Sequence, residues 1–291
     1  MSKIISPILY YVWLVPVSYL PFGLLYFISN IVFFLTYRVV GYRKTVVREN
    51  LRRAFPEKSL EELKDIELKF YKHFADFLME SIKSISISEK EILKRCHIIN
   101  PEVPQKYYEQ GKSVLVLCGH YNNWEYYAVG LAQQMKHKTR AAYQPLNNSF
   151  FNGTIKRIRE RYGIRMVAIK EIPRVFEEMK NDLTMTVMVN DQSPSKPKAA
   201  YWNKFLGIET GWMMGAEKLA KRYEYPVLFG CIRKTKRGFY EVTFYEITDN
   251  PTHLKEGEIL DKHTGLLEMV VRENPQYWLW SHRRWKHNKP S

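Results

Sequence analysis

The chain has few cysteines and none of the glycine-rich motifs that mark common nucleotide sites. Its 291 residues include three cysteines, Cys96, Cys118 and Cys231, and no CxxC pair. The cysteine count therefore indicates neither a disulfide framework nor a zinc site. The motifs GxGxxG, GxxxxGK(S/T) and GxSxG are absent. The sequence thus indicates neither dinucleotide binding nor P-loop chemistry, and it lacks the nucleophile motif of serine hydrolases.

Negative charge is also scarce, with 30 Asp and Glu against 45 Lys and Arg, a formal charge of +15. Such an excess implies an acidic partner: nucleic acid, an anionic membrane surface, or an acidic protein or ligand. No helix-turn-helix pattern, aromatic ribonucleoprotein motif or zinc finger is present, so we predict no nucleic-acid partner. Tryptophans lie among arginines near the end, at Trp278, Trp280 and Trp285, which suits a membrane interface or a stacking surface.

Charged residues are missing from 4 to 37, where Ile, Leu, Val, Phe, Tyr and Trp dominate. The run is longer than the roughly 20 residues that span a bilayer, but Pro16 and Pro21 divide it. It predicts either one tilted span around 20–40 or two short helices in the membrane interface. In a soluble protein, the same run would be a buried hairpin of helices. We therefore assign residues 1–40 to a membrane anchor. The basic residues from Arg38 onward place the remaining chain, 41–291, on the cytoplasmic side.

Beyond residue 40 the pattern predicts an α/β fold: a mixed, mostly parallel sheet flanked by helices. Apolar runs predict strands at 113–118, 139–143, 165–169, 183–189 and 226–232. Helical spacing predicts helices at 60–84, 89–96, 124–134, 150–162, 172–179, 212–222 and 254–272. Ser59 and Glu62 predict a capping box at the first of these helices. Residues 226–233 and 239–247 predict an antiparallel hairpin at the sheet edge, and 191–204 a loop.

The strand at 113–118 leads into a histidine that is followed five residues later by an acid, Glu125. On one helix these side chains would lie about 140° apart. They converge only if His120 lies in the turn and Glu125 in the first helical turn, with Gly119 supplying a permissive backbone and Asn122 or Asn123 a cap. An imidazole held by a carboxylate suits a general base. The alternative is a capping box of Asn122 and Glu125, with His120 an ordinary loop residue.

Two further groups of polar residues are candidates for substrate binding. Asp191 and Gln192 follow the strand at 183–189, at the sheet edge where His120 is expected, although aspartate there also suits a turn. Arg157 and Arg161 share one helix face, and Arg165 follows them. They suit phosphate binding, or else they coat a solvated surface.

These segments, in this order, resemble the bacterial lipid A biosynthesis late acyltransferases, the lauroyl and myristoyl transferases of the lysophospholipid acyltransferase group. The resemblance covers nearly the whole chain and includes the apolar N-terminus. Its further motifs are Tyr42-Arg43, residues 48–51, 54–56, Gly119-His120-x4-Glu125, 143–148, 190–192, 205–207 with Thr210, 276–280 and 282–286. Leu206 stands where a second aromatic is expected and Gln144 where arginine is common, departures that bear on the acceptor.

The resemblance implies a glycerolipid acyltransferase-like fold and a membrane-associated O-acyltransferase of lipopolysaccharide biosynthesis. The acyl chain would pass from acyl carrier protein to a hydroxyl of a lipid A precursor, at the bacterial inner membrane and with no metal or cofactor. Catalysis would use His120 as general base and Glu125 to fix its tautomer. Substrate contacts would come from Arg157, Arg161, Arg165, Asp191, Gln192 and Thr210.

Three other functions remain compatible with the residues. The acceptor could be another lipid, such as an aminoacyl lipid or a glycosylated phospholipid. The protein could be a membrane-bound phosphatase or phosphodiesterase that uses His120 and Asp191. It could also be a basic membrane adaptor with no catalytic activity.

Overall fold

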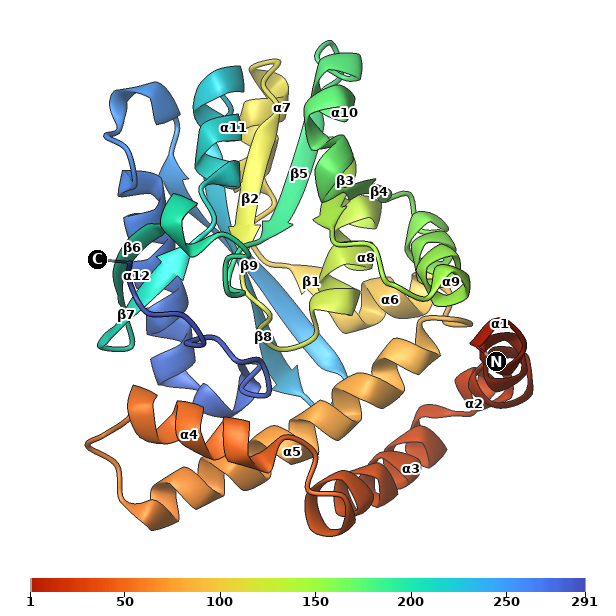
Figure 1. Cartoon of the computed structure of the whole chain (residues 1–291). Coiled ribbons are helices and arrows are strands. Elements are labelled where there is room, and N and C mark those ends of the chain that lie inside the picture. Colours follow the sequence, from red (N-terminus) through yellow and green to blue (C-terminus); the bar gives the residue numbers. More distant parts are fainter. Residues whose placement is uncertain (1, 291) are drawn as a thin grey trace.

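The centre of the fold is a seven-stranded sheet in the order β1-β9-β8-β2-β5-β3-β4, seen in a computed structural model that describes residues 2–290 (Figure 1). Neighbouring strands run parallel except for β8 and β9, which form an antiparallel hairpin. The mixed, mostly parallel sheet is therefore confirmed. The strands are β1 (Cys96–Ile98), β2 (Val114–Cys118), β3 (Lys138–Tyr143), β4 (Arg165–Ala168), β5 (Thr184–Val189), β8 (Val227–Lys236) and β9 (Phe239–Thr248).

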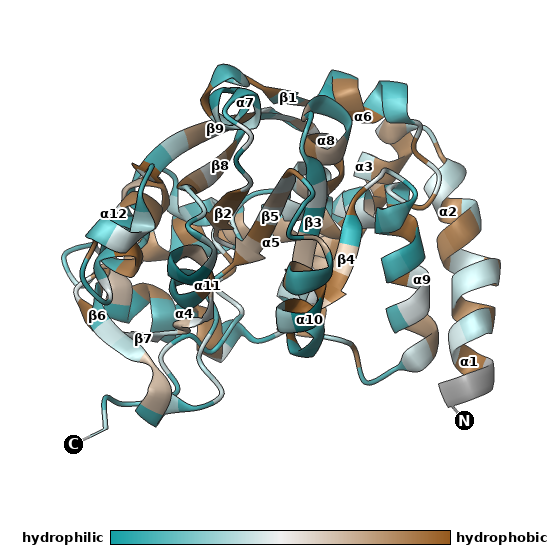
Figure 2. Ribbon diagram, turned by 90° about the horizontal axis from the view of Figure 1, so that it is seen from above, coloured by the Kyte–Doolittle hydropathy of each residue, from teal (hydrophilic) through white to brown (hydrophobic). Residues whose placement is uncertain are grey.

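Helices cover both faces of this sheet because the central strands are apolar on both sides. Leu115 and Leu117 of β2 face one cluster, with α10 (Ile172–Glu178), α11 (Gly215–Tyr223) and α12 (Glu258–Glu273). Val114 and Val116 face the other, with α6 (Glu89–Arg95), α7 (Glu102–Glu109) and α8 (Trp124–Gln134). This alternation is the two-residue period of a strand. Figure 2 shows β2 and β5 in brown and the outer helices α10 and α11 largely in teal.

The N-terminal helices lie beside the sheet, toward the carboxyl ends of β2 and β5 (Figure 1). They are α1 (Ser2–Ile8), α2 (Val15–Tyr19), α3 (Phe22–Phe34), α4 (Lys44–Ala54) and α5 (Leu60–Lys83), with π-helical turns at Leu9–Leu14 and Leu35–Val39. Pro21 precedes α3 and ends the first apolar stretch, as its fixed backbone angle predicts. The Ser59 and Glu62 capping box is confirmed at the start of α5. Helix α3 packs against α5.

Five elements, β1, α4, α7, β6 (Tyr201–Phe205) and β7 (Ile208–Trp212), differ from the sequence expectations. Strand β1 pairs with β9, so the β8–β9 hairpin is not the edge of the sheet. Helices α4 and α7 were not predicted. A second hairpin, β6 and β7, occupies the end of the expected loop and the start of the expected helix at 212. Its turn is hard to foresee because Leu206 adopts a left-handed φ of 52° that leucine rarely takes.

Candidate active site

The turn after β2 holds the histidine, and three neighbouring segments fix that turn. Asn123 caps α8, its Oδ1 accepting the Tyr126 N–H at 2.9 Å. Asn122 adopts a left-handed φ of 53°, donates its N–H to the Tyr277 carbonyl at 2.9 Å, and donates Nδ2 to the Ile232 carbonyl at 3.0 Å. The cap by Asn122 or Asn123 is therefore confirmed for Asn123. The sharp turn depends on asparagine, a residue that tolerates this backbone region.

Gly119 has a different role from the one expected of it. Its φ is not in the left-handed region, so the chain bends at Asn122 instead. A Cβ on Gly119 would lie 2.7 Å from Leu267 Cδ1 and 3.1 Å from Asp191 Oδ2. The glycine is needed because the backbone and the Asp191 carboxylate approach each other closely.

Asp191, two residues after β5, holds the His120 imidazole. Its Oδ1 lies 2.5 Å from His120 Nδ1, and its Oδ2 accepts the His120 backbone N–H at 2.7 Å. Trp278 Nε1 donates to the same Oδ2 at 2.8 Å. Burial alone would raise the pKa of Asp191, but His120 and these donors outweigh it and hold that pKa well below its ordinary value. An ionised Asp191 fixes the tautomer in which Nδ1 carries the proton and Nε2 is the acceptor.

Glu125 does not contact the imidazole, and the expectation that it fixes the tautomer is wrong. Its carboxylate receives two hydrogen bonds from Arg159, Nε to Oε2 at 2.8 Å and Nη2 to Oε1 at 2.6 Å. Burial alone would lower the pKa of Arg159, but Glu125 raises it. His120 lies in a turn and Glu125 in the first turn of α8, as the spacing predicts. The carboxylate that binds the imidazole, however, follows β5 and is distant in the sequence.

A cavity of about 760 Å³ opens beside the histidine, within the range of ligand pockets. Gln192 and His120 both line it, and Gln192 Nε2 lies 3.3 Å from His120 Nε2. The imidazole nitrogen that does not bind Asp191 is therefore on the cavity side, where Gln192 is its partner. Tyr143, the last residue of β3, and Gln144, which follows it, also line the cavity. Its apolar wall comes from β3–β5 and the helices around them, mainly Trp124, Ala128, Ala142, Met166, Ile172, Val187, Val189 and Leu219.

Four cations line the cavity, and none is among the arginines chosen from the sequence. They are Lys156 and Arg159 on α9 (Ser149–Glu160) with Lys218 and Arg222 on α11. Asn152, Ile155, Lys156 and Arg159 all line the cavity and follow the i, i+3, i+4, i+7 spacing of one helix face. That spacing is the signal that sequence reasoning overlooked.

The predicted arginines lie elsewhere. Arg157 and Arg161 are each about 200° around the helix from Arg159. Arg157 is exposed, and Arg161 donates to the carbonyls of Ser84, Ile85 and Ile87. Arg165 begins β4, at the opposite edge from His120, and pairs with Glu178 at 3.6 Å. Their substrate contacts remain predictions without support from this geometry.

The C-terminal tryptophans and Thr210 are packed in the interior next to Asp191 and do not face the cavity. Trp278, Trp280 and Trp285 are buried, so the expectation that they suit a membrane interface or a stacking surface is wrong. Trp278 bonds Asp191, and Trp285 Nε1 donates to Thr210 Oγ1 at 2.8 Å. Thr210 is itself buried and does not line the cavity. Apolar rings exclude water from the carboxylate, which strengthens its bond to His120.

Within residues 2–290, no group of three or more His, Cys, Asp and Glu side chains is arranged to hold a metal ion. A comparison with curated proteins finds no match to this chain. A family model described as bacterial lipid A biosynthesis acyltransferase matches residues 2–287, nearly the whole chain. A match over nearly the whole chain establishes membership of this family, and membership implies acyltransferase activity in lipid A synthesis. The chain therefore belongs to the bacterial lipid A biosynthesis acyltransferases.

Proposed function

We propose that this protein moves a fatty acyl chain from the thioester of acyl carrier protein to a hydroxyl of a lipid A precursor, with His120 as general base. One observation carries the proposal: an imidazole whose Nδ1 is held by a buried aspartate faces a cavity with a largely apolar wall. The histidine supplies proton transfer and the apolar wall suits a hydrocarbon chain.

The reaction then follows from the tautomer. His120 Nε2 takes the proton of the acceptor hydroxyl, and the oxygen attacks the thioester carbonyl carbon. The tetrahedral intermediate collapses with cleavage of the carbon–sulfur bond. The thiolate leaves and takes the proton back from the imidazolium, which gives an ester and a carrier thiol. Asp191 stabilises the imidazolium between these steps, and Gln192 moves from Nε2 to admit the hydroxyl.

Arg159 is the cation we assign to the developing oxyanion. Nε and Nη2 bind Glu125, while Nη1 makes no hydrogen bond within residues 2–290. Glu125 thus orients the guanidinium rather than the imidazole, and its catalytic role is that of a positioning residue. A fixed donor aimed at a developing negative charge is a large contribution to transition-state stabilisation.

The remaining cations suit the charged parts of the substrates. Lys156, Lys218 and Arg222 line the cavity and are our candidates for the phosphate groups of the acceptor, a role the sequence suggested for Arg157 and Arg161. Acyl carrier protein is acidic as a family, so the charge of +15 favours its docking as well as an anionic membrane.

Residues 1–40 form the membrane attachment in this proposal, with 41–291 as the catalytic domain on the cytoplasmic face of the inner membrane. The supporting observation is an inverted amphipathic pattern. Ser18 and Ser29 are buried against the protein, while Trp13, Phe27 and Phe34 are exposed. A helix that turns its serines inward and its aromatic residues outward is suited to lipid rather than to water.

Helix α3 is long and apolar enough to span a bilayer with the turn that follows it, Phe22–Val39, but its contacts favour an in-plane position. Ser29 donates to Asp76 of α5 at 2.7 Å, and Arg237 Nη2 donates to Asn30 Oδ1 at 3.1 Å. Farther along, Lys72 of α5 lies 5.8 Å from the Phe33 ring. A spanning α3 would carry these charged side chains into the bilayer, at a cost of several kcal/mol. We therefore favour α1–α3 lying in the interface.

Labelling distinguishes the two positions of α3. Tyr19, just before the helix, is exposed, and the native cysteines are buried. In inverted inner-membrane vesicles, whose cytoplasmic face is outside, an impermeant maleimide should modify Tyr19→Cys and Val40→Cys alike. Modification of Val40→Cys alone would show a span and contradict the in-plane position.

The reaction is tested with purified protein, acyl carrier protein loaded with a fatty acid, and an underacylated lipid A precursor. Mass spectrometry should show one added acyl chain on the lipid and an equal amount of free carrier thiol. Aminoacyl lipids and glycosylated phospholipids serve as competing acceptors. Transfer to one of them in preference to the lipid A precursor would contradict the proposed acceptor, and acyl-coenzyme A as the better donor would contradict the carrier.

A further inference from the structure

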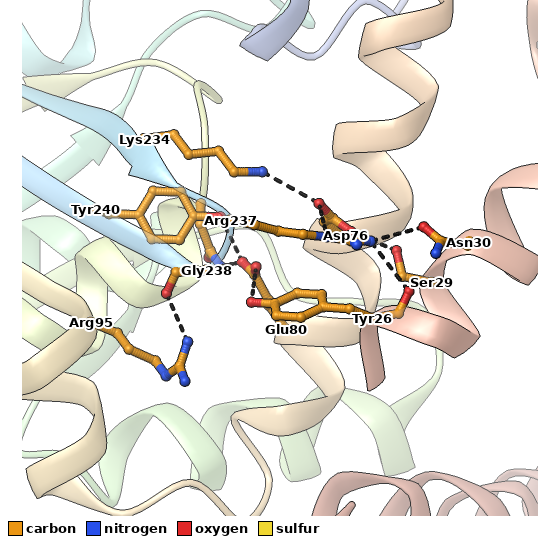
Figure 3. A network of polar contacts seen from close by, with 11 residues as sticks. Tyr26, Ser29, Asn30, Asp76, Glu80, Arg95, Lys234, Arg237, Gly238 and Tyr240 are labelled. Atoms are coloured by element: carbon orange, nitrogen blue, oxygen red, sulfur yellow. Dashed lines mark hydrogen bonds and ion pairs between the residues drawn. The ribbon is translucent and has the colours of Figure 1, made fainter. Parts of the chain in front are cut away.

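A second buried carboxylate, Glu80 of α5, binds Tyr26 of α3 and Tyr240 of β9 (Figure 3) and also reaches the catalytic turn. Its Oε1 accepts the hydroxyl of Tyr26, on α3, at 3.0 Å. Its Oε2 accepts Asn123 Nδ2 at 2.6 Å and the hydroxyl of Tyr240, on β9, at 2.7 Å. The side chain is 1% exposed. One carboxylate therefore ties three elements that are far apart in the sequence.

Asn123 makes this connection relevant to catalysis, because it is the N-cap of α8 and lies three residues after His120. Its Oδ1 bonds the Tyr126 N–H, so the amide is fully oriented only when Nδ2 also has its acceptor. We propose that Glu80 is a positioning residue for the acyl transfer. It fixes the Asn123 cap and, through that cap, the turn that carries His120. Because Tyr26 of α3 binds the same carboxylate, the way α3 packs on α5 affects the position of the turn.

The proposal has a matched control four residues away on α5. Asp76 also receives a side chain of α3, Ser29, and binds Lys234 and Arg237 of the β8–β9 hairpin. It makes no hydrogen bond to residues 119–125. Loss of the Ser29 contact loosens α3 without touching the turn, whereas loss of the Tyr26 contact acts on Glu80 directly.

Three substitutions interrupt the connection at different points. Glu80→Gln keeps the volume but replaces one acceptor oxygen with a donor. Asn123→Ser keeps an effective cap and loses the amide that reaches Glu80. Tyr26→Phe removes only the hydroxyl from α3. The inference rests on the proposed function, so kcat and KM are measured for acyl transfer with each substrate varied separately.

We expect kcat to fall about tenfold in Glu80→Gln and Asn123→Ser and about threefold in Tyr26→Phe, with each KM within about twofold of the wild-type value. Ser29→Ala should retain kcat within about twofold. Wild-type kcat in both Asn123→Ser and Tyr26→Phe would overturn the proposal even if Glu80→Gln fails to fold. An equal loss in Ser29→Ala would overturn it too, because seating of α3 in general would then be the cause.

A spectroscopic measurement needs no substrate and separates this inference from the proposed function. The proton between His120 Nδ1 and Asp191 should give a downfield proton NMR signal, assigned by its loss in Asp191→Asn. It should shift or broaden in Glu80→Gln and Asn123→Ser and stay unchanged in Ser29→Ala. Unchanged signals in the first two variants would overturn the positioning role. Absence of acyl transfer by the wild-type protein would contradict the proposed function alone.

Discussion

Asp191 and Glu80 are two buried carboxylates that each accept three hydrogen bonds, yet their pKa values shift in opposite directions. Burial opposes ionisation of both. Beside Asp191 stands an imidazole that can become positive, and the pKa of Asp191 falls well below its ordinary value. Glu80 bonds only neutral donors. Burial, aided by the like-charged Asp76, outweighs those bonds and the nearby Lys234 and raises the pKa of Glu80. The sign of the shift follows from the charge of the partners rather than from the number of bonds.

The two carboxylates therefore have different roles. Asp191 stays ionised throughout the working pH range, so it can stabilise the positive imidazole that forms when His120 takes a proton. The donors to Glu80 are one amide and two phenols, and burial raises the pKa of both phenols, so all three stay neutral. The bonds of Glu80 therefore fix positions and transmit no charge to the reaction. One site is built for proton transfer and the other for geometry, and substitutions of the two carboxylates should differ accordingly.

Among the carboxylate substitutions, the largest effect should come from Asp191→Asn, which keeps the size of the side chain and removes its charge. We expect kcat to fall by about two to three orders of magnitude with KM little changed, because the tautomer and the imidazolium lose their support. Glu125→Gln should cost about tenfold, since it disturbs Arg159 and not His120. Steady-state kinetics of both variants tests the assignment. A larger loss in Glu125→Gln would restore Glu125 as the partner of the histidine.

An intermediate effect is expected on stability from Arg161→Ala. Arg161 closes the end of α5 by donating to three carbonyls, so its loss should lower the free energy of unfolding by about 1–2 kcal/mol. Arg157, exposed on the same helix, is the control, and Arg157→Ala should stay within about 0.5 kcal/mol of the wild type. Chemical denaturation measures both. A raised acceptor KM in Arg161→Ala with unchanged stability would support the sequence-based role instead.

The smallest effect is a pH dependence that differs between the two carboxylates. A raised pKa in the fold means that the contribution of Glu80 to stability is present below its unfolded value, about 4.5, and is lost as the pH rises through the folded value. Glu80→Gln should therefore gain stability relative to the wild type on going from about pH 4.5 to about pH 7. For Asp191, whose pKa is lowered, the contribution is present above about 3.8 and is lost only on acidification.

Denaturation of both variants and the wild type over this range gives the two differences directly. Asp191 itself stays ionised in both the folded and the unfolded protein between about pH 5 and about pH 7, so its own titration leaves the stability flat there. A Glu80→Gln difference that is equally flat would contradict the raised pKa of Glu80.

Much of the fold could be predicted because the apolar runs are unambiguous. Strands β2, β3, β4, β5, β8 and β9 fall within a residue or a few of the expected ranges. The missed elements carry weak local signals. Strand β1 has three residues, and the β6–β7 turn has a leucine where a turn-forming residue is expected. Tertiary pairing decides such segments, and no local pattern reports it.

The sequence predicted most of the residues of the site but not which of them bind each other. His120, Asp191 and Gln192 do meet, as residues that follow neighbouring parallel strands should. Asp191 binds the imidazole because the fold places it there, although it is 71 residues away in the sequence. Glu125 was favoured only because it is close to His120 in the sequence. Arg159 could have been found, because its helix face also carries Lys156, Ile155 and Asn152.

Single-turnover transfer from acyl carrier protein by purified His120→Ala, with and without added imidazole, tests whether the histidine held by Asp191 is the general base. We predict a rate two to four orders of magnitude below wild type, the scale of a lost general base. Free imidazole should restore part of it, because the histidine faces an open cavity. A near-wild-type rate without imidazole would contradict the account, since the Asp191-held histidine would then take no part in the reaction.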